Sequence, residues 1–177
     1  AGEALDKIAK FLGLGYPGGP VIERRSAGGS PGKFAFALPR MKDGSLDFSF
    51  SGLKTAALRW IGETKMSSRH PELPDFLASF EASVVRTLLE NVAHAAGRFH
   101  PLSVILCGGV ARNKRLREGF EELARASGLP AFIPSPELCT DNAAMVGALA
   151  SEKLRGKKRP PLSLDLDAYP RFSRARE

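Results

Sequence analysis

The stretch from Val104 to Asn113, in which an apolar run ends in two glycines, constrains the fold more than any other part of the sequence. The run Val104–Cys107 is short and rich in β-branched residues, which predicts a buried strand. After Gly108 and Gly109, apolar residues recur with helical spacing, at Leu116, Phe120, Leu123 and Ala124. A strand that breaks at glycines and continues as a helix brings backbone N–H groups close to a ligand such as a phosphate or a ribose. The same turn also serves for tight packing alone, and two glycines do not decide between these interpretations.

The spacing of apolar residues predicts further helices on both sides of this turn. They cover Ala4–Leu12, Val21–Arg25, the residues from Ser51 to Trp60, Pro74–Phe99 and Leu138–Ala150. Ser51 is the expected N-cap of its helix, and Thr140 or Asp141 is the expected N-cap of the last one. His94 lies inside the longest helix and is interpreted as structural.

The remaining segments predict strands and turns. Pro130–Pro134 is expected to form a short second strand, and Phe34–Leu38 a strand or an extended segment. Gly13–Pro20 contains too much glycine and proline for a regular element, and Glu63–Pro74 is a polar break.

The composition is that of a globular protein with a surplus of positive charge. The 177 residues are enough for one domain with a buried core, or for a domain with an insertion. No apolar run approaches the roughly 18 residues that span a bilayer, and the first residues do not resemble a signal peptide.

Cys107 and Cys139 have apolar neighbours, which predicts buried, reduced thiols in a cytoplasmic protein. The net charge of +7 favours a polyanionic partner such as nucleic acid, although a basic surface also serves solubility alone.

Two carboxylates and the basic tail each allow two interpretations. Asp6 lies off the apolar stripe of its helix, as a solvated carboxylate or as an acceptor for a ligand hydroxyl. Asp141, at the start of a helix, is either a cap or a ligand for a metal or a hydroxyl. The basic, proline-containing tail from Arg155 onward is either a phosphate-binding arm, with Lys157, Lys158 and Arg159 at its centre, or a solvated terminus.

Motifs at four places occur together in the order and spacing of one family. They are Gly2–Lys7 with Leu14–Pro20, Asp47–Lys54, Gly108–Asn113 and Cys139–Asn142. From Ala1 to about Leu154 the chain resembles the C-terminal half of the universal tRNA threonylcarbamoyladenosine transferases, which are TsaD in bacteria and subunits of the KEOPS complex in archaea and eukaryotes.

The resemblance implies an α/β fold: a partial C-terminal lobe of the actin-like ATPase fold, shared with sugar kinases and heat-shock chaperones, that carries a mainly helical insertion. Residues 1–100 would form a mainly helical subdomain at the substrate and nucleotide cleft. Residues 101–154 would form the α/β lobe with the Gly-Gly nucleotide loop and the metal-binding aspartate. Residues 155–177 would be a basic tail.

The resemblance also implies an activity and a set of binding residues. The family transfers the threonylcarbamoyl group of threonylcarbamoyl-adenylate to N6 of adenosine 37 in tRNA. Asp6 would hydrogen-bond the ribose of this adenylate, or of ATP, and Gly19 would approach it through its backbone. Gly108 and Gly109 would form the nucleotide loop, and Asn113 would contact the adenine or the ribose.

A metal and several partners are implied in the same way. Asp141 would be one ligand of a single iron or zinc ion, which would act as a Lewis acid on the carbamoyl oxygen. The partners would be tRNA and the other subunits of the threonylcarbamoyladenosine synthesis complex, in the cytoplasm and without a membrane. The reaction needs no protein nucleophile, and no catalytic residue is assigned.

The chain departs from the family pattern at the metal site. The family's His-x-x-x-His pair is absent, since His70, His94 and His100 are never four residues apart, and its first phosphate loop is absent too. We therefore expect weak metal binding and no activity from this chain alone. An open sheet surface would make it dimerise or aggregate.

Other functions compete with the transferase. They are a non-catalytic, nucleotide-binding scaffold lobe of the same pathway and a small-molecule kinase of the same fold. The older family label, O-sialoglycoprotein endopeptidase, finds no support, because no His-Glu-x-x-His motif and no Ser/His/Asp set is recognisable.

Overall fold

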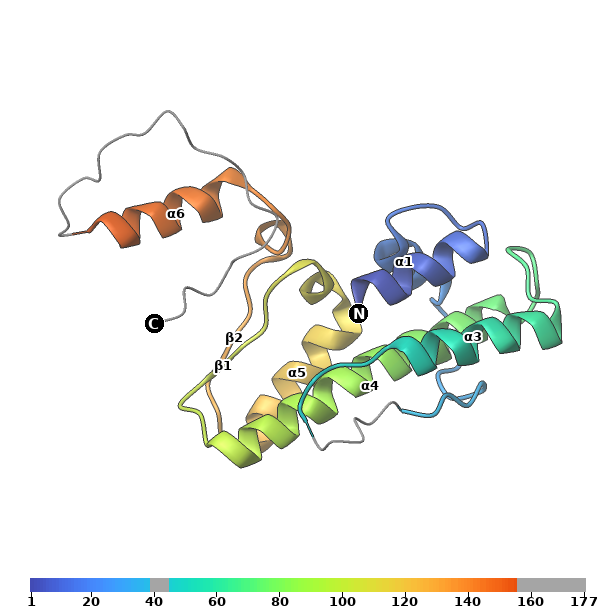
Figure 1. Ribbon diagram of the computed structural model, residues 1–177, viewed down its shortest axis with the longest axis horizontal. Helices are drawn as coiled ribbons and strands as arrows, with labels where there is room; N and C mark the ends of the chain where they lie inside the picture. Colours follow the sequence, from blue (N-terminus) through green and yellow to red (C-terminus); the bar gives the residue numbers. More distant parts are fainter. Residues whose placement is uncertain (39–44, 156–177) are drawn as a thin grey trace. The chain divides into compact units, whose positions relative to one another are not determined.

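The computed structural model describes residues 1–38 and 45–155 of the chain (Figure 1). The chain divides into two compact units, Ala1–Thr140 and Asp141–Glu177. The expected basic arm around Lys157, Lys158 and Arg159 lies outside the described residues, as does almost all of the tail. No helix among the described residues is long and apolar enough to span a membrane.

The first unit is mostly helical and contains a small parallel sheet. Its elements are α1 (Gly2–Phe11), α2 (Gly18–Arg25), α3 (Ser51–Thr64), α4 (Leu73–Phe99), β1 (Val104–Ile105), the 3-10 helix η1 (Gly109–Arg112), α5 (Lys114–Ala126), β2 (Ala131–Phe132) and the 3-10 helix η2 (Pro136–Leu138). The helices expected from apolar spacing are therefore present, and the α/β class is confirmed.

Helix α4 is the centre of the core. Phe76, Leu77 and Phe80 are completely buried on it, and each such side chain contributes about 1.5–3 kcal/mol through removal from water. The rings of Phe34 and Phe36 pack edge-on against this helix, Phe34 on Phe76 with 5.4 Å between ring centroids. The apolar stripe that predicted α4 is therefore the surface on which the rest of the unit assembles.

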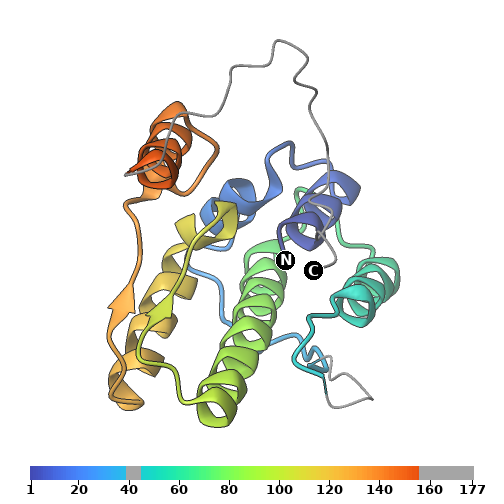
Figure 2. The ribbon, with the colours of Figure 1, turned by 60° about the vertical axis from the view of Figure 1, so that its left-hand side comes forward.

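The sheet consists of β1 and β2, which pair in parallel with Ile105 opposite Phe132. Helix α5 connects the strands and packs against both β2 and α4 (Figure 2). Ile105 and Phe132 are 67% and 58% exposed, so the expected buried strand is wrong for this face. In β1, Val104 is half-buried and Ile105 is exposed. Cys107, two residues after this strand, is exposed, contrary to expectation, whereas Cys139 is buried as expected.

Several expected boundaries also differ. Phe50, and not Ser51, is the N-cap of α3, and it supplies no side-chain hydrogen bond. Helix α2 begins at Gly18, inside the segment expected to be irregular, because a proline in the first helical turn sacrifices no hydrogen bond. The segment Phe34–Leu38 forms no strand; the backbone N–H of Phe34 instead donates to Ser79 Oγ on α4.

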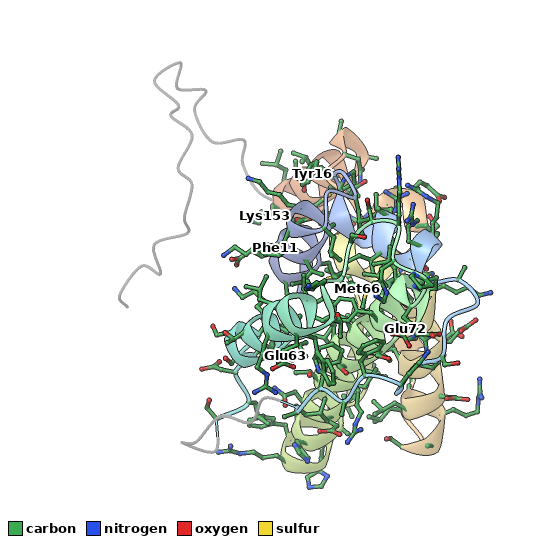
Figure 3. All side chains as sticks on the ribbon, turned by 90° about the vertical axis from the view of Figure 1, so that its right-hand side faces the viewer. Phe11, Tyr16, Glu63, Met66, Glu72 and Lys153 are labelled. Carbon is green, nitrogen blue, oxygen red and sulfur yellow. The ribbon has the colours of Figure 1, made fainter. Side chains whose placement is uncertain are left out.

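One end of the first unit carries exposed aromatic rings. Phe11 ends α1 and Tyr16 lies in the loop that follows, with 62% and 83% of their surface exposed (Figure 3). Met66, in the loop after α3, is buried instead and belongs to the core. The turn between α1 and α2 is thus a surface feature, whereas the turn after α3 contributes to the core.

The described part of the second unit is α6 (Ala143–Leu154) with its N-cap. Asn142 caps the helix, since its Oδ1 accepts the N–H of Met145 at 2.9 Å. Thr140 and Asp141 were the expected caps, and both precede the true one because η2 occupies the start of the expected helix.

Candidate functional site

A pocket of about 390 Å³ lies in the first unit, among α1, α2 and the turn formed by η1 and the start of α5. This volume lies in the range of small-molecule sites. Its walls are largely apolar and include Leu5, Pro20 and Val110. Its polar side chains include Asp6 and Arg112.

The side of the pocket formed by α1 and α2 depends on Asp6 and Gly18. The backbone N–H of Gly18, at the start of α2, donates to Asp6 Oδ1 at 2.7 Å. A carboxylate at a helix N-terminus satisfies a donor that has no partner inside the helix, and it is attracted by the helix dipole. Asp6 also lines the pocket, so the carboxylate that Gly18 orients borders the space that a ligand would occupy.

Gly18 allows α1 and α2 to approach closely. A Cβ atom on Gly18 would lie 2.6 Å from the Cα of Asp6 and 2.6 Å from the carbonyl oxygen of Leu5. On Gly19 it would only reach Leu5 Cδ1, at 3.8 Å. Of this glycine pair, Gly18 is therefore needed for packing, whereas Gly19 lines the pocket. The sequence showed the pair but not this division, because only the contact with α1 separates the two positions.

The other side of the pocket is the N-terminus of α5. The N–H of Lys114 donates to Glu23 Oε1 of α2 at 2.8 Å, and the N–H of Leu116 donates to Asn113 Oδ1 at 2.9 Å. Asn113 is the N-cap, and its extended backbone turns the chain from η1 into α5. Two side chains thus satisfy the first turn of this helix.

A buried carboxylate on α4 supports this turn from behind. Asn113 Nδ2 donates to Glu81 Oε1 at 2.6 Å. The Ser26 hydroxyl lies within hydrogen-bond distance of two acceptors, Glu81 Oε2 at 3.3 Å and the carbonyl oxygen of Glu23 at 3.1 Å. Arg115 Nε lies 3.4 Å from the same Oε2 and forms an ion pair. Glu81 is 4% exposed and Asn113 is 8% exposed. Glu81 was not among the expected site residues, although an acid inside the apolar stripe of α4 was visible in the sequence.

The structure brings most of the expected site residues together. Asp6, Gly19, Gly109 and Asn113 all line this pocket. Gly108 precedes it with a φ of 90°, a conformation that favours glycine, and the N–H of Ala111 donates to its carbonyl oxygen. The side chain of Asn113 is occupied by Glu81 and Leu116, so its contact with a ligand stays a prediction.

The metal site is not assembled within the part of the chain that the structure describes. Nowhere in residues 1–38 and 45–155 do three His, Cys, Asp or Glu side chains come close enough to hold an ion. Asp141 is exposed and belongs to the second unit. Because iron and zinc sites in proteins use three or more side chains, the residues present do not fit a metal on their own.

The fold and the pocket define an α/β protein with a site of small-molecule size bounded by helix N-termini. The family model of TsaD, tRNA N6-adenosine threonylcarbamoyltransferase, matches residues 1–148. A tRNA N6-adenosine threonylcarbamoyltransferase of Moorella thermoacetica is 41% identical over 165 residues, which are 93% of this chain and 48% of the relative. One from Syntrophotalea carbinolica is 44% identical with the same coverage, and one from Synechococcus sp. is 45% identical over 90% of this chain and 44% of the relative.

This chain belongs to the tRNA N6-adenosine threonylcarbamoyltransferase family. It spans about half the length of the curated relatives that it matches.

Proposed function

We propose that this chain supplies the nucleotide-binding half of a tRNA N6-adenosine threonylcarbamoyltransferase, as a C-terminal lobe of the actin-like ATPase fold. Its pocket takes the adenosine part of threonylcarbamoyl-adenylate. The observation that carries the proposal is Asp6, which lines a pocket of about 390 Å³ and whose Oδ1 is fixed by the N–H of Gly18. A rigidly held carboxylate oxygen is an acceptor suited to a ribose hydroxyl.

The rest of the pocket matches the other parts of an adenosine phosphate. Leu5 and Val110 offer apolar surface to a purine ring, and Gly19 and Gly109 present backbone without side chains. Arg112 supplies a positive charge that suits the phosphate of the leaving group. Each contact orients the adenylate, which is where such a site contributes most to the rate.

In the proposed reaction, N6 of the tRNA adenosine attacks the carbonyl carbon of the carbamoyl group. The bond from that carbon to the phosphate oxygen breaks, adenosine monophosphate (AMP) leaves with the electron pair, and the amine nitrogen releases one proton to water. The residues of this chain hold the leaving group and provide no nucleophile. The tRNA is the acceptor, the other subunits of the synthesis complex are partners, and the protein acts in the cytoplasm.

The proposed binding of the adenylate does not require the metal ion. We retain Asp141 as one carboxylate of an iron or zinc site whose further ligands are not brought together among the residues that the structure describes. No step above depends on that ion. A chelator such as EDTA is therefore expected to leave the affinity for AMP unchanged.

Binding of AMP to this chain, measured by titration calorimetry, tests the pocket. Asp6→Asn keeps the shape and can still accept from Gly18, but it places an amide where the ribose needs an acceptor. Loss of a charged hydrogen bond is expected to weaken binding about tenfold or more. Glu3→Gln is the control, because Glu3 lies on the same helix and contacts Lys7 and Lys54 rather than the pocket. No binding of AMP, or equal affinity of Asp6→Asn, would overturn the proposal.

A scaffold lobe is the second candidate, favoured by the lack of an assembled metal site in the described residues. Both functions include nucleotide binding, so transfer must distinguish them. We expect no modified tRNA when this chain alone meets threonylcarbamoyl-adenylate and unmodified tRNA. Modification is expected once the N-terminal half of a relative is added. Failure of that mixture, with both parts folded and AMP bound, would favour the scaffold.

A further inference from the structure

We infer that Glu81 is a positioning residue of the adenylate pocket: it fixes Asn113, and through it the wall formed by η1 and the first turn of α5. The inference rests on the proposed function for its ligand. The coupling of Glu81 to this wall does not depend on the ligand, because it follows from the contacts of Glu81 with Asn113, Ser26 and Arg115.

The contact with Glu81 fixes the orientation of the Asn113 amide. Glu81 Oε1 can only accept, so the atom of Asn113 that lies 2.6 Å away must be the donor Nδ2. Oδ1 then points the other way, to the N–H of Leu116 at 2.9 Å. Glu81 therefore selects the one amide orientation in which Asn113 caps α5.

The turn formed by η1 connects the Asn113 cap to the pocket. Asn113 follows directly after η1, and Val110, Arg112 and Asn113 all line the pocket. The N–H of Asn113 donates to the carbonyl oxygen of Val110 at 3.0 Å, so the asparagine and the wall residue form one turn. A rotation of the Asn113 side chain would break its hydrogen bond to the N–H of Leu116 and so remove the cap of α5 that adjoins this turn.

Glu81 is itself held in place by further contacts. Its carboxylate is 5% exposed and is held on its other oxygen by Ser26 Oγ, at the end of α2, and by Arg115. Helix α2 also carries Gly19 and Glu23, which line the opposite side of the pocket. Glu81 thus connects both sides of the pocket to α4, the helix with the largest number of buried residues in the described part of the unit.

An exchange of the two partners separates positioning from ligand contact. Asn113→Asp keeps a good N-cap acceptor. It also replaces the hydrogen bond of 2.6 Å between Asn113 Nδ2 and Glu81 Oε1 by two carboxylates that repel each other. Adding Glu81→Gln restores one hydrogen bond between the positions, with donor and acceptor exchanged. Asn113→Asp is expected to weaken AMP binding about tenfold, and the double variant to recover it to within about threefold of the original affinity.

The control is Thr87→Val, which changes another buried residue of α4 whose Oγ donates only to the carbonyl oxygen of Ser83 in the same helix. It is expected to lower stability while leaving the AMP affinity unchanged. If the double variant regains stability but not AMP affinity, Asn113 contacts the ligand itself and the positioning role is overturned. Equal affinity of Asn113→Asp and the original chain would also overturn it.

A measurement without ligand keeps the inference separate from the proposed function. In ¹H–¹⁵N spectra of the free chain, the amide signals of Val110 and Arg112 are expected to move in Asn113→Asp and to return in the double variant. Unmoved signals would overturn the inference even if AMP binds as proposed. If AMP fails to bind the original chain while these signals respond as expected, the proposed ligand is wrong and the coupling of Glu81 to the wall remains.

Discussion

Gly18 begins α2 at a point where a Cβ atom would lie 2.6 Å from the Cα of Asp6, and its N–H donates to the carboxylate of that same residue. One glycine therefore provides both the close approach of two helices and the hydrogen bond that orients the pocket aspartate. This relationship makes the pocket depend on a residue that does not itself need to touch a ligand.

The glycine pair gives a direct test of this packing. Gly18→Ala is expected to destabilise the fold by about 1–3 kcal/mol, because α1 and α2 must separate to admit the methyl group. Gly19→Ala should be neutral or slightly stabilising, since its Cβ would make an ordinary contact with Leu5 and alanine favours a helix. Urea denaturation of both variants measures the difference, and equal stabilities would contradict the packing.

Acid should loosen the contact between the loop before α3 and the start of α4. The Lys33 ammonium, and then the N–H of Ser30, lower the pKa of Asp75 below its usual value, each at 2.8 Å from its carboxylate. This contact stabilises the fold above the unfolded pKa of about 3.9, and the stabilisation is lost as the pH falls through the lower folded pKa.

The fall in Tm between about pH 6 and about pH 3 should therefore be smaller for Asp75→Asn than for the original chain. Because the side chains of Lys33 and Asp75 are 45% and 22% exposed, solvent and salt screen the pair, so the difference should be small and should shrink in high salt. Glu121→Gln is the control, since Glu121 is an exposed acid on α5. Identical acid dependence of Asp75→Asn and the original chain would rule out the contact.

The two cysteines should differ in reactivity. Cys107 is exposed after β1, whereas Cys139 is buried with its Sγ near the carbonyl oxygens of Pro134 and Ser135. A thiol reagent such as Ellman's reagent should modify Cys107 quickly and Cys139 only on unfolding. Cys107→Ser should remove the fast reaction, and a fast reaction that persists in this variant would contradict the burial of Cys139.

The open face of the sheet should cause self-association. Ile105 and Phe132 are paired in register and both exposed, which places two large apolar side chains side by side in water. Sedimentation of the chain should depend on concentration, and Ile105→Thr with Phe132→Thr should reduce the association while keeping residues that favour strands. A monomer at every concentration would contradict this prediction.

The sequence was sufficient to predict the regular elements that depend on local spacing. The apolar stripe of α4 and the strand, glycine and helix sequence around Gly108 are local patterns, and both are present. Asp6 and Gly109, which the family motifs indicated as binding residues, both line the pocket, and their contact with a ligand stays a prediction.

The features that the sequence did not predict depend on contacts between distant residues. Glu81 meets Asn113 across 32 positions, and Gly18 meets Asp6 across 12, so neither contact leaves a periodic signal. The segment from Phe34 was expected to be a strand or an extended segment; its rings pack on α4, and no neighbouring strand pairs with it among the described residues. Helix caps shifted by one or two residues because a cap depends on how the preceding turn is closed.

The most direct test of the account is a ¹H–¹⁵N titration of this chain with AMP. The amides of Gly19 and Gly109, which line the pocket, should shift in proportion to bound nucleotide, and those of Gly52 and Gly62 in α3 should not. That pattern would place the adenosine between α2 and η1, beside Asp6. An unchanged spectrum, or shifts confined to α3, would contradict the claim that this pocket binds the adenylate.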